Sequence, residues 1–153
     1  MPEFGSAGGV VTAKSCSSSY ISRMYGRQGH AVDRLGFACG DSYSDVGAVG
    51  GFGGVDVTNN CIGGFTSVKV TYGLYVSKIN AFCKSSNSYK SMGDGIFTQS
   101  YTHNGELKCN SNQVLVSAEI SVGDWNIVNR VHFICGGILS TLVQIYSIIL
   151  NVC

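Results

Sequence analysis

The sequence predicts an all-β domain built from three similar repeats. Six of the seven cysteines form pairs at nearly the same spacing: Cys16 with Cys39, Cys61 with Cys83, and Cys109 with Cys135. The second cysteine of each pair ends a similar segment, and these segments read VDRLGFAC, VSKINAFC and VNRVHFIC. The first and third alternate apolar and polar residues, which is typical of a half-buried strand. A period of roughly 45–50 residues indicates pseudo-threefold symmetry.

The repeats are expected at about 8–41, 50–85 and 93–135. Each begins with glycines, continues as a strand to the first cysteine and a second strand, and turns at a glycine into a third strand. Buried columns are expected at Leu35, Ile79 and Val131 and at Phe37, Ala81 and Phe133. Because cores are close-packed, Phe82 or Tyr75 should fill the volume that Ala81 leaves. In VLVSAEISV, one face is predicted to carry Val114, Val116, Ala118, Ile120 and Val122.

Cysteines paired in every repeat favour disulfides within each repeat, with free thiols as the alternative. Disulfides would place the protein in an oxidising, extracellular compartment, so the sequence predicts a secreted protein. No CxxC motif occurs, and His30, His103 and His132 lie at no ligand spacing, so no metal ion or organic cofactor is expected. Cys153 has no partner in the repeats and is either free or intermolecular.

Length and charge exclude several classes of function. The chain has 153 residues, enough for one domain with its own core. Charged residues make up 12% and the net charge is +1, which argues against nucleic-acid binding. No run of like charges indicates an anionic membrane surface as partner.

The two ends of the chain differ from the repeats. The first six residues, MPEFGS, resemble a cloning scar, so 1–6 is expected outside the fold and 7–135 forms the domain. The tail, 136–153, is apolar and from Ile138 uncharged, but at about 16 residues it is shorter than a membrane-spanning helix. A final strand or helix packed on the domain is expected. A remnant of a hydrophobic anchor and a contact in a homo-oligomer are the alternatives.

The sharpest local motif is a GxxxD sequence at Gly29–Asp33, inside GRQGHAVDRLGF. It predicts a tight turn between two strands, with backbone N–H groups facing outward and a carboxylate at the end of the turn. A second glycine-rich segment, GGFGG, follows at Gly50–Gly54, where bare backbone lets a ligand approach closely. A carboxylate makes charge-assisted hydrogen bonds to vicinal hydroxyls. Together these groups are suited to binding a sugar.

These motifs resemble those of the jacalin-related lectins. That family has a β-prism I fold of three Greek-key units, with a glycine-rich GG loop beside a GxxxD loop in the sugar site. The resemblance implies a neutral glycan of mannose/glucose or galactose type, or a glycoprotein carrying one, as partner. It implies these carbohydrate-binding residues: Gly29, His30, Ala31, Asp33, Gly50 and Gly51. Two features depart from the family, since its GG loop usually precedes the GxxxD loop by nearly the whole domain and its typical plant members lack the cysteine pairs.

The other two repeats lack the acid. Ser77 takes its place in the second repeat and Asn129 in the third, where Trp125 replaces the motif glycine. One working site is therefore expected. Asp124, Trp125 and Asn129 form a second candidate site, because an aromatic face can stack on a sugar ring.

Several alternatives remain open at this level. Asp33 could satisfy backbone donors in its own turn. The chain could also be a secreted structural or effector-type protein that uses the same scaffold without binding sugar. An enzyme is not expected, because no pair of acids recurs at corresponding loops as glycoside hydrolysis requires. A β-trefoil lectin is disfavoured because its repeated QxW signature is missing.

Overall fold

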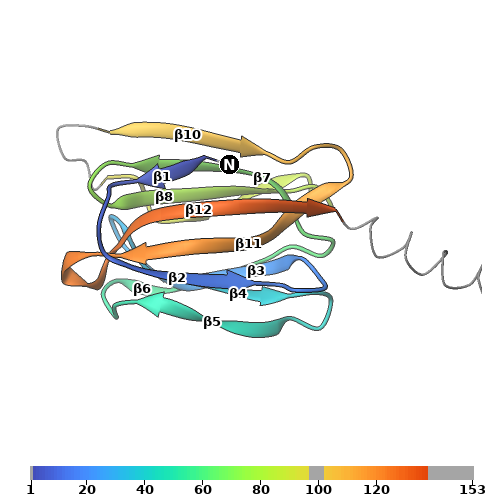
Figure 1. Cartoon of the computed structure of the whole chain (residues 1–153), viewed down its shortest axis with the longest axis horizontal. Helices are drawn as coiled ribbons and strands as arrows, with labels where there is room; N and C mark the ends of the chain where they lie inside the picture. The colour runs from blue at the N-terminus through green and yellow to red at the C-terminus, as the bar shows by residue number, and fades with distance from the viewer. Residues whose placement is uncertain (1, 97–101, 138–153) are drawn as a thin grey trace, which may run out of the picture.

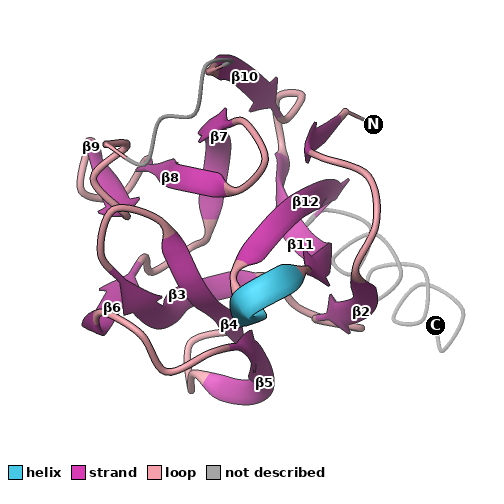
Figure 2. Ribbon diagram, turned by 90° about the vertical axis from the view of Figure 1, so that its left-hand side faces the viewer, coloured by secondary structure: helices cyan, strands magenta, loops and turns pink. Residues whose placement is uncertain are grey.

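The computed structural model describes residues 2–96 and 102–137, which form three four-stranded antiparallel sheets around a common axis (Figures 1 and 2). The first sheet has the order β5 (Ser44–Gly50), β4 (Val32–Cys39), β3 (Ile21–Gln28), β6 (Val55–Asn60). The second has the order β10 (His103–Lys108), β7 (Phe65–Tyr72), β8 (Val76–Cys83), β9 (Ser88–Met92). The third has the order β1 (Glu3–Gly5), β12 (Val128–Gly137), β11 (Gln113–Val122), β2 (Val10–Ser15). This arrangement confirms the predicted all-β, β-prism I fold.

Each sheet combines strands from two repeats. At its centre lies the hairpin of one repeat, β3–β4, β7–β8 or β11–β12. One edge is the strand that leads to the first cysteine of the following repeat, so β6 pairs with β3 and β10 with β7. The ring closes because β2, near the start of the chain, pairs with β11. The sequence predicts three strands per repeat, whereas each sheet has four, because β5 and β9 are too glycine-rich or too polar to show the buried alternation.

The predicted core columns are buried. Exposure is 1% or less at Leu35, Ile79, Val131, Phe37, Ala81 and Phe133. The rings of Phe37 and Phe133 meet edge to face with centroids 6.1 Å apart, so the core joins the first and third sheets directly.

Neither Phe82 nor Tyr75 fills the volume that Ala81 leaves in the core. Phe82 is only half-buried and packs against Tyr89 of the neighbouring strand, and Tyr75 stacks on Trp125 at the end of the prism. The large side chain in this sheet's buried face is Phe65, which is fully buried. It pairs with the second cysteine of its repeat, as Ile21 and Leu115 do in theirs.

A β-bulge interrupts the predicted alternation of β11. The register shifts between Leu115 and Ser117, leaving Val116 as the extra residue. Leu115 is therefore fully buried and Val116 is half-buried, while Ala118 and Ile120 face the core as expected. Equivalent bulges occur in β3 and β7, so the irregularity is part of the repeat.

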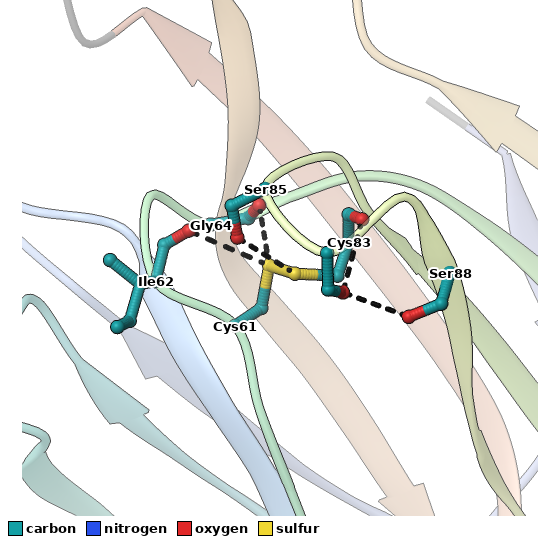
Figure 3. Close-up of a disulfide and its surroundings, with 7 residues drawn as sticks. Cys61, Ile62, Gly64, Cys83, Ser85 and Ser88 are labelled. Atoms are coloured by element: carbon teal, nitrogen blue, oxygen red, sulfur yellow. Dashed lines mark hydrogen bonds between the residues drawn. A yellow bond between two sulfur atoms is a disulfide. The ribbon is translucent and has the colours of Figure 1, made fainter.

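The three predicted disulfides are present, each with its Cα atoms 5.6 Å apart. Although each lies within one sequence repeat, it joins two sheets, because its first cysteine follows an edge strand of the preceding sheet. Cys61 follows β6 of the first sheet and Cys83 ends β8 of the second (Figure 3). Around this bridge, the Ser85 hydroxyl lies 3.3 Å from Cys83 Sγ. The disulfides thus connect the three sheets in a ring at one end of the prism.

The prediction that residues 1–6 lie outside the fold is wrong for residues 3–5. Strand β1 pairs with β12, and Phe4 is buried. The segment also matches the other repeats, since a buried or half-buried apolar residue and a positive-φ glycine recur as Phe4–Gly5, Val49–Gly50 and Met92–Gly93. A Cβ on these glycines would lie 2.0–2.2 Å from a carbonyl oxygen, that of Asn129, Asp33 or Ser77. The start of the chain therefore completes the third sheet.

Most of the predicted tail, from position 138 to Cys153, lies outside the described residues. Its first two residues, Gly136 and Gly137, form the end of β12. Within the described ranges, no helix is long and apolar enough to cross a membrane.

Candidate functional site

The hairpin loops converge at the end of the prism opposite the disulfides, the end that faces the viewer in Figure 2. Three loops connect the central strands, at 29–31, 73–75 and 123–127, and three glycine-containing segments adjoin them, at 50–54, 93–95 and 5–9. The predicted GxxxD loop, the GG loop and the second candidate site therefore all lie at one end of the molecule.

Hydrogen bonds tie these segments together in a cycle. Each glycine-containing segment bonds to a hairpin loop of another repeat: Gly51 N–H to Asn126 O at 2.7 Å, Asp94 N–H to Gly29 O at 3.2 Å, and Ser6 Oγ to Leu74 O at 2.8 Å. Because every loop is held by a neighbour, the loop end forms one connected surface.

Asp33 lies near the start of β4 with its carboxylate half-buried. No residue in the described part of the chain donates a hydrogen bond to either carboxylate oxygen, so the side chain does not satisfy its own turn. Burial raises the pKa of Asp33 above its ordinary value, and the nearby charge of Arg27 opposes this shift. The loop end thus presents an acceptor pair without protein donors.

The carboxylate faces the bare backbone of the GG loop. A Cβ built on Gly53 would lie 2.8 Å from Asp33 Oδ1, and one on Gly54 would lie 3.1 Å from Oδ2. Arg27 holds this loop, because its Nε donates to Gly53 O at 3.1 Å and its Nη2 to Gly54 O at 2.7 Å. Its Nη1 also pairs with Asp56 at 2.8 Å. Only glycine leaves space beside the carboxylate at these two positions.

Gly50 and Gly51, which the motif predicts as carbohydrate-binding residues, form hydrogen bonds within the protein. The Gly51 N–H donates to the carbonyl oxygens of both Asp33, at 2.8 Å, and Asn126, at 2.7 Å. The Gly50 carbonyl accepts a hydrogen bond from Arg34 Nη1 at 2.8 Å. The two residues anchor the GG loop, and Gly53 and Gly54 border the carboxylate. Spacing from the motif could not distinguish among the glycines of GGFGG.

The loop at Gly29–Ala31 forms the predicted tight turn. The Gly29 N–H donates to Ala31 O at 3.0 Å and closes it. No acceptor among the described residues takes the backbone N–H of His30 or Ala31. His30 is exposed, whereas only 4% of Ala31 is exposed. The exposed His30 ring lies with Nδ1 2.8 Å from Asp94 Oδ2. The pKa of Asp94 is lowered, first by the Ile96 N–H and then by His30.

The second candidate site is only partly assembled. A cleft of about 510 Å³ is bordered by Gly8, Gly9, Tyr75 and Asp124. Asn129 also lines this cleft, although only 6% of the residue is exposed, and its Nδ2 donates to Gly8 O at 3.1 Å.

Trp125 is 78% exposed and adopts a positive φ of 62°, with its ring stacked on that of Tyr75 at a centroid distance of 6.4 Å. The structure thus brings Asp124 and Asn129 to the cleft, while Trp125 stacks on Tyr75, which also lines it. Ser77, the equivalent residue in the second repeat, is also buried and donates to Thr71 O.

Gly50→Ala is expected to lower the free energy of unfolding by about 3 kcal/mol, the upper end of the usual cost of a strained backbone position. The added Cβ would lie 2.2 Å from the Asp33 carbonyl oxygen, at a φ of +121°. Gly63→Ala is the matched control, because Gly63 also has a positive φ, +86°, but its Cβ would meet nothing within 4 Å. Urea unfolding measures both; equal losses would show that the close approach at Gly50 contributes nothing.

Comparison with solved structures finds the same fold in lectins and in β-prism domains. The second β-prism domain of RbmC from V. cholerae, solved bound to N-acetylglucosaminyl-β-1,2-mannose, superposes with a TM-score of 0.67 at 22% identity, over 88% of this chain and 98% of that one. AcmJRL, a mannose-binding jacalin-related lectin from Ananas comosus, gives 0.70 at 16% identity, over 90% and 96%. Artocarpin, in complex with mannotriose, gives 0.69 at 12%, over 89% and 95%.

These likenesses establish the β-prism fold. The sequence itself matches no protein-family model and no curated protein.

Proposed function

We propose that this protein binds a neutral glycan as a lectin, through Asp33 and the two loops beside it. The observation that carries the proposal is the half-buried Asp33 carboxylate, which receives no hydrogen bond from the described residues. A half-buried polar group without a partner is costly, and a ligand with hydroxyl donors would remove that cost.

The contacts follow from the loop geometry. Two vicinal sugar hydroxyls donate to the two Asp33 oxygens, and the N–H group of the exposed His30 donates to a sugar oxygen. Because Gly53 and Gly54 have no side chains, the loop borders the carboxylate with backbone alone. A neutral sugar is favoured, because an anionic one would meet a like charge in a partly desolvated site.

The structural relatives support the same class of ligand. One is described as mannose-binding, and two are complexes with mannose-containing sugars. They favour the mannose/glucose type over the galactose type for this site. The three disulfides favour an oxidising compartment, consistent with a secreted protein that meets glycoproteins outside the cell.

A glycan array with the purified protein tests the proposal. The wild-type protein is expected to bind a set of neutral glycans, and Asp33→Ala is expected to lose that set. Asp41→Ala is the matched control, because Asp41 is an exposed acid just after Cys39, at the disulfide end. Absence of any wild-type binding would instead favour a secreted structural or effector-type role for the scaffold.

A further inference from the structure

The outer face of the third sheet brings together Glu3, Glu119 and His132, which come from three adjacent strands. His132 on β12 is paired directly with Glu3 on β1 and with Glu119 on β11. Directly paired residues hold their Cβ atoms about 4.5–5.5 Å apart, so all three side chains project from one face within reach of each other. Their separation in sequence explains why ligand spacing did not reveal them.

The three side chains offer a preassembled set of ligand atoms. One atom from each residue lies within 4.8 Å of the other two. His132 Nδ1 lies 3.6 Å from Glu119 Oε2, beyond normal hydrogen-bond distance. Both ring nitrogens of His132 are buried and have no hydrogen-bond partner among the described residues. Buried ring nitrogens without a partner are uncommon and require an explanation.

The equivalent positions in the other two sheets hold no imidazole and no carboxylate. In the second sheet they are Lys69, Asn80 and Ser91, and the Ser91 hydroxyl donates to Asn80 Oδ1 at 2.6 Å. In the first sheet they are Tyr25, Gly36 and Ala48, where a Cβ on Gly36 would lie 2.4 Å from that of Ala48. Two acids facing one imidazole are therefore specific to the third sheet in the described structure.

We propose that Glu3, Glu119 and His132 bind a divalent transition-metal ion of the zinc class. One imidazole nitrogen and two carboxylate oxygens are ligands that zinc accepts, at about 2.0–2.2 Å, with water completing a four-coordinate shell. Small side-chain rotations close the present separations, because the strands already fix the backbone. The guanidinium of Arg130, 3.5 Å from Glu3 Oε2, competes with the metal for that carboxylate.

Such an ion would cross-link β1 to β11 and β12. Strand β1 has only three residues and pairs with a single neighbour, so it depends on few contacts. The Gly8–Gly9 segment that follows β1 borders the cleft at the loop end. Metal binding is thus expected to hold the start of the chain on the third sheet, independently of the proposed sugar site at Asp33.

Isothermal titration with zinc chloride, on the full disulfide-bonded chain with Cys153 alkylated, tests the site. One ion per chain is expected. Glu3→Gln, Glu119→Gln and His132→Ala should each weaken binding by more than about tenfold, since losing even an outer-shell partner of a metal site costs 10- to 100-fold. His103→Ala is the control, because His103 is exposed on a different sheet, and it should bind zinc normally.

A second readout separates binding from damage to the fold. Zinc is expected to raise the unfolding temperature of the wild type and of His103→Ala, and to leave that of His132→Ala unchanged. No zinc binding by the wild type would overturn the proposal, and so would equal binding by His132→Ala or by Glu3→Gln. Circular dichroism checks that each variant keeps its β structure.

Discussion

Replacing Asp33 with asparagine is expected to weaken glycan binding about ten- to a hundredfold while leaving the fold intact. The amide keeps the shape of the side chain but removes the charge, and hydrogen bonds to a charged group contribute about 1.5–3 kcal/mol. Each 1.4 kcal/mol changes affinity about tenfold. Titration calorimetry with the strongest glycan from the array measures the loss.

The stability of the same variant shows whether Asp33 is a binding or a structural residue. Because burial raises the pKa of Asp33, the folded protein holds this proton more tightly than the unfolded chain does. Ionisation of Asp33 therefore opposes folding at neutral pH, and this cost disappears as the pH falls through the window between the raised pKa and the ordinary one. Asp33→Asn should leave the free energy of unfolding at pH 7 unchanged or slightly higher.

Two results would contradict this account of Asp33. Unchanged glycan affinity in Asp33→Asn would remove Asp33 from the site. A clear loss of stability in urea would show that the carboxylate supports the loop instead of the ligand.

Removing the Cys61–Cys83 disulfide by a double change to alanine is expected to lower the free energy of unfolding by about 3 kcal/mol. The two cysteines are 22 residues apart, and closing a loop of that length removes roughly this much chain entropy from the unfolded state. The bridge also joins the first sheet to the second, so its loss releases a contact between sheets. Urea unfolding under non-reducing conditions measures the change.

The other bridges provide an internal comparison. Cys61 and Cys83 are both almost fully buried, whereas Cys109 is only half-buried. Mild reductant should therefore open Cys109–Cys135 before Cys61–Cys83, which alkylation and peptide mapping can follow.

A loss below about 1 kcal/mol in the Cys61/Cys83 double alanine variant would mean that the sheets remain joined without the bridge.

The all-β class, the threefold repeat and the three disulfide pairs could be predicted from the sequence because they depend on local periodicity and spacing. Alternation in the first and third repeats, with the second aligned to them, placed Leu35, Val131 and Ile79 in the core correctly. Paired cysteines at constant spacing identified the bridges. The GxxxD motif identified a tight turn, which the Gly29–Ala31 loop forms.

Other features depend on contacts between distant parts of the chain. The bulge at Val116 moved Leu115 into the core, and no composition rule locates such an extra residue. Strand β1 joined the fold because β12 offered an edge to pair with, which residues 1–6 alone do not reveal.

The candidate site shows the same division. The sequence by itself determined that Asp33 ends a tight turn and that a glycine-rich segment follows. Only the tertiary structure decided that Gly53 and Gly54, rather than Gly50 and Gly51, border the carboxylate. The reason is that Arg27 on β3 and Asn126 in the 123–127 loop both form hydrogen bonds to this glycine-rich loop. It also decided that Asn129 is buried and that Glu3, Glu119 and His132 meet. Strand pairing closes such distances, and the sequence carries no local signal of it.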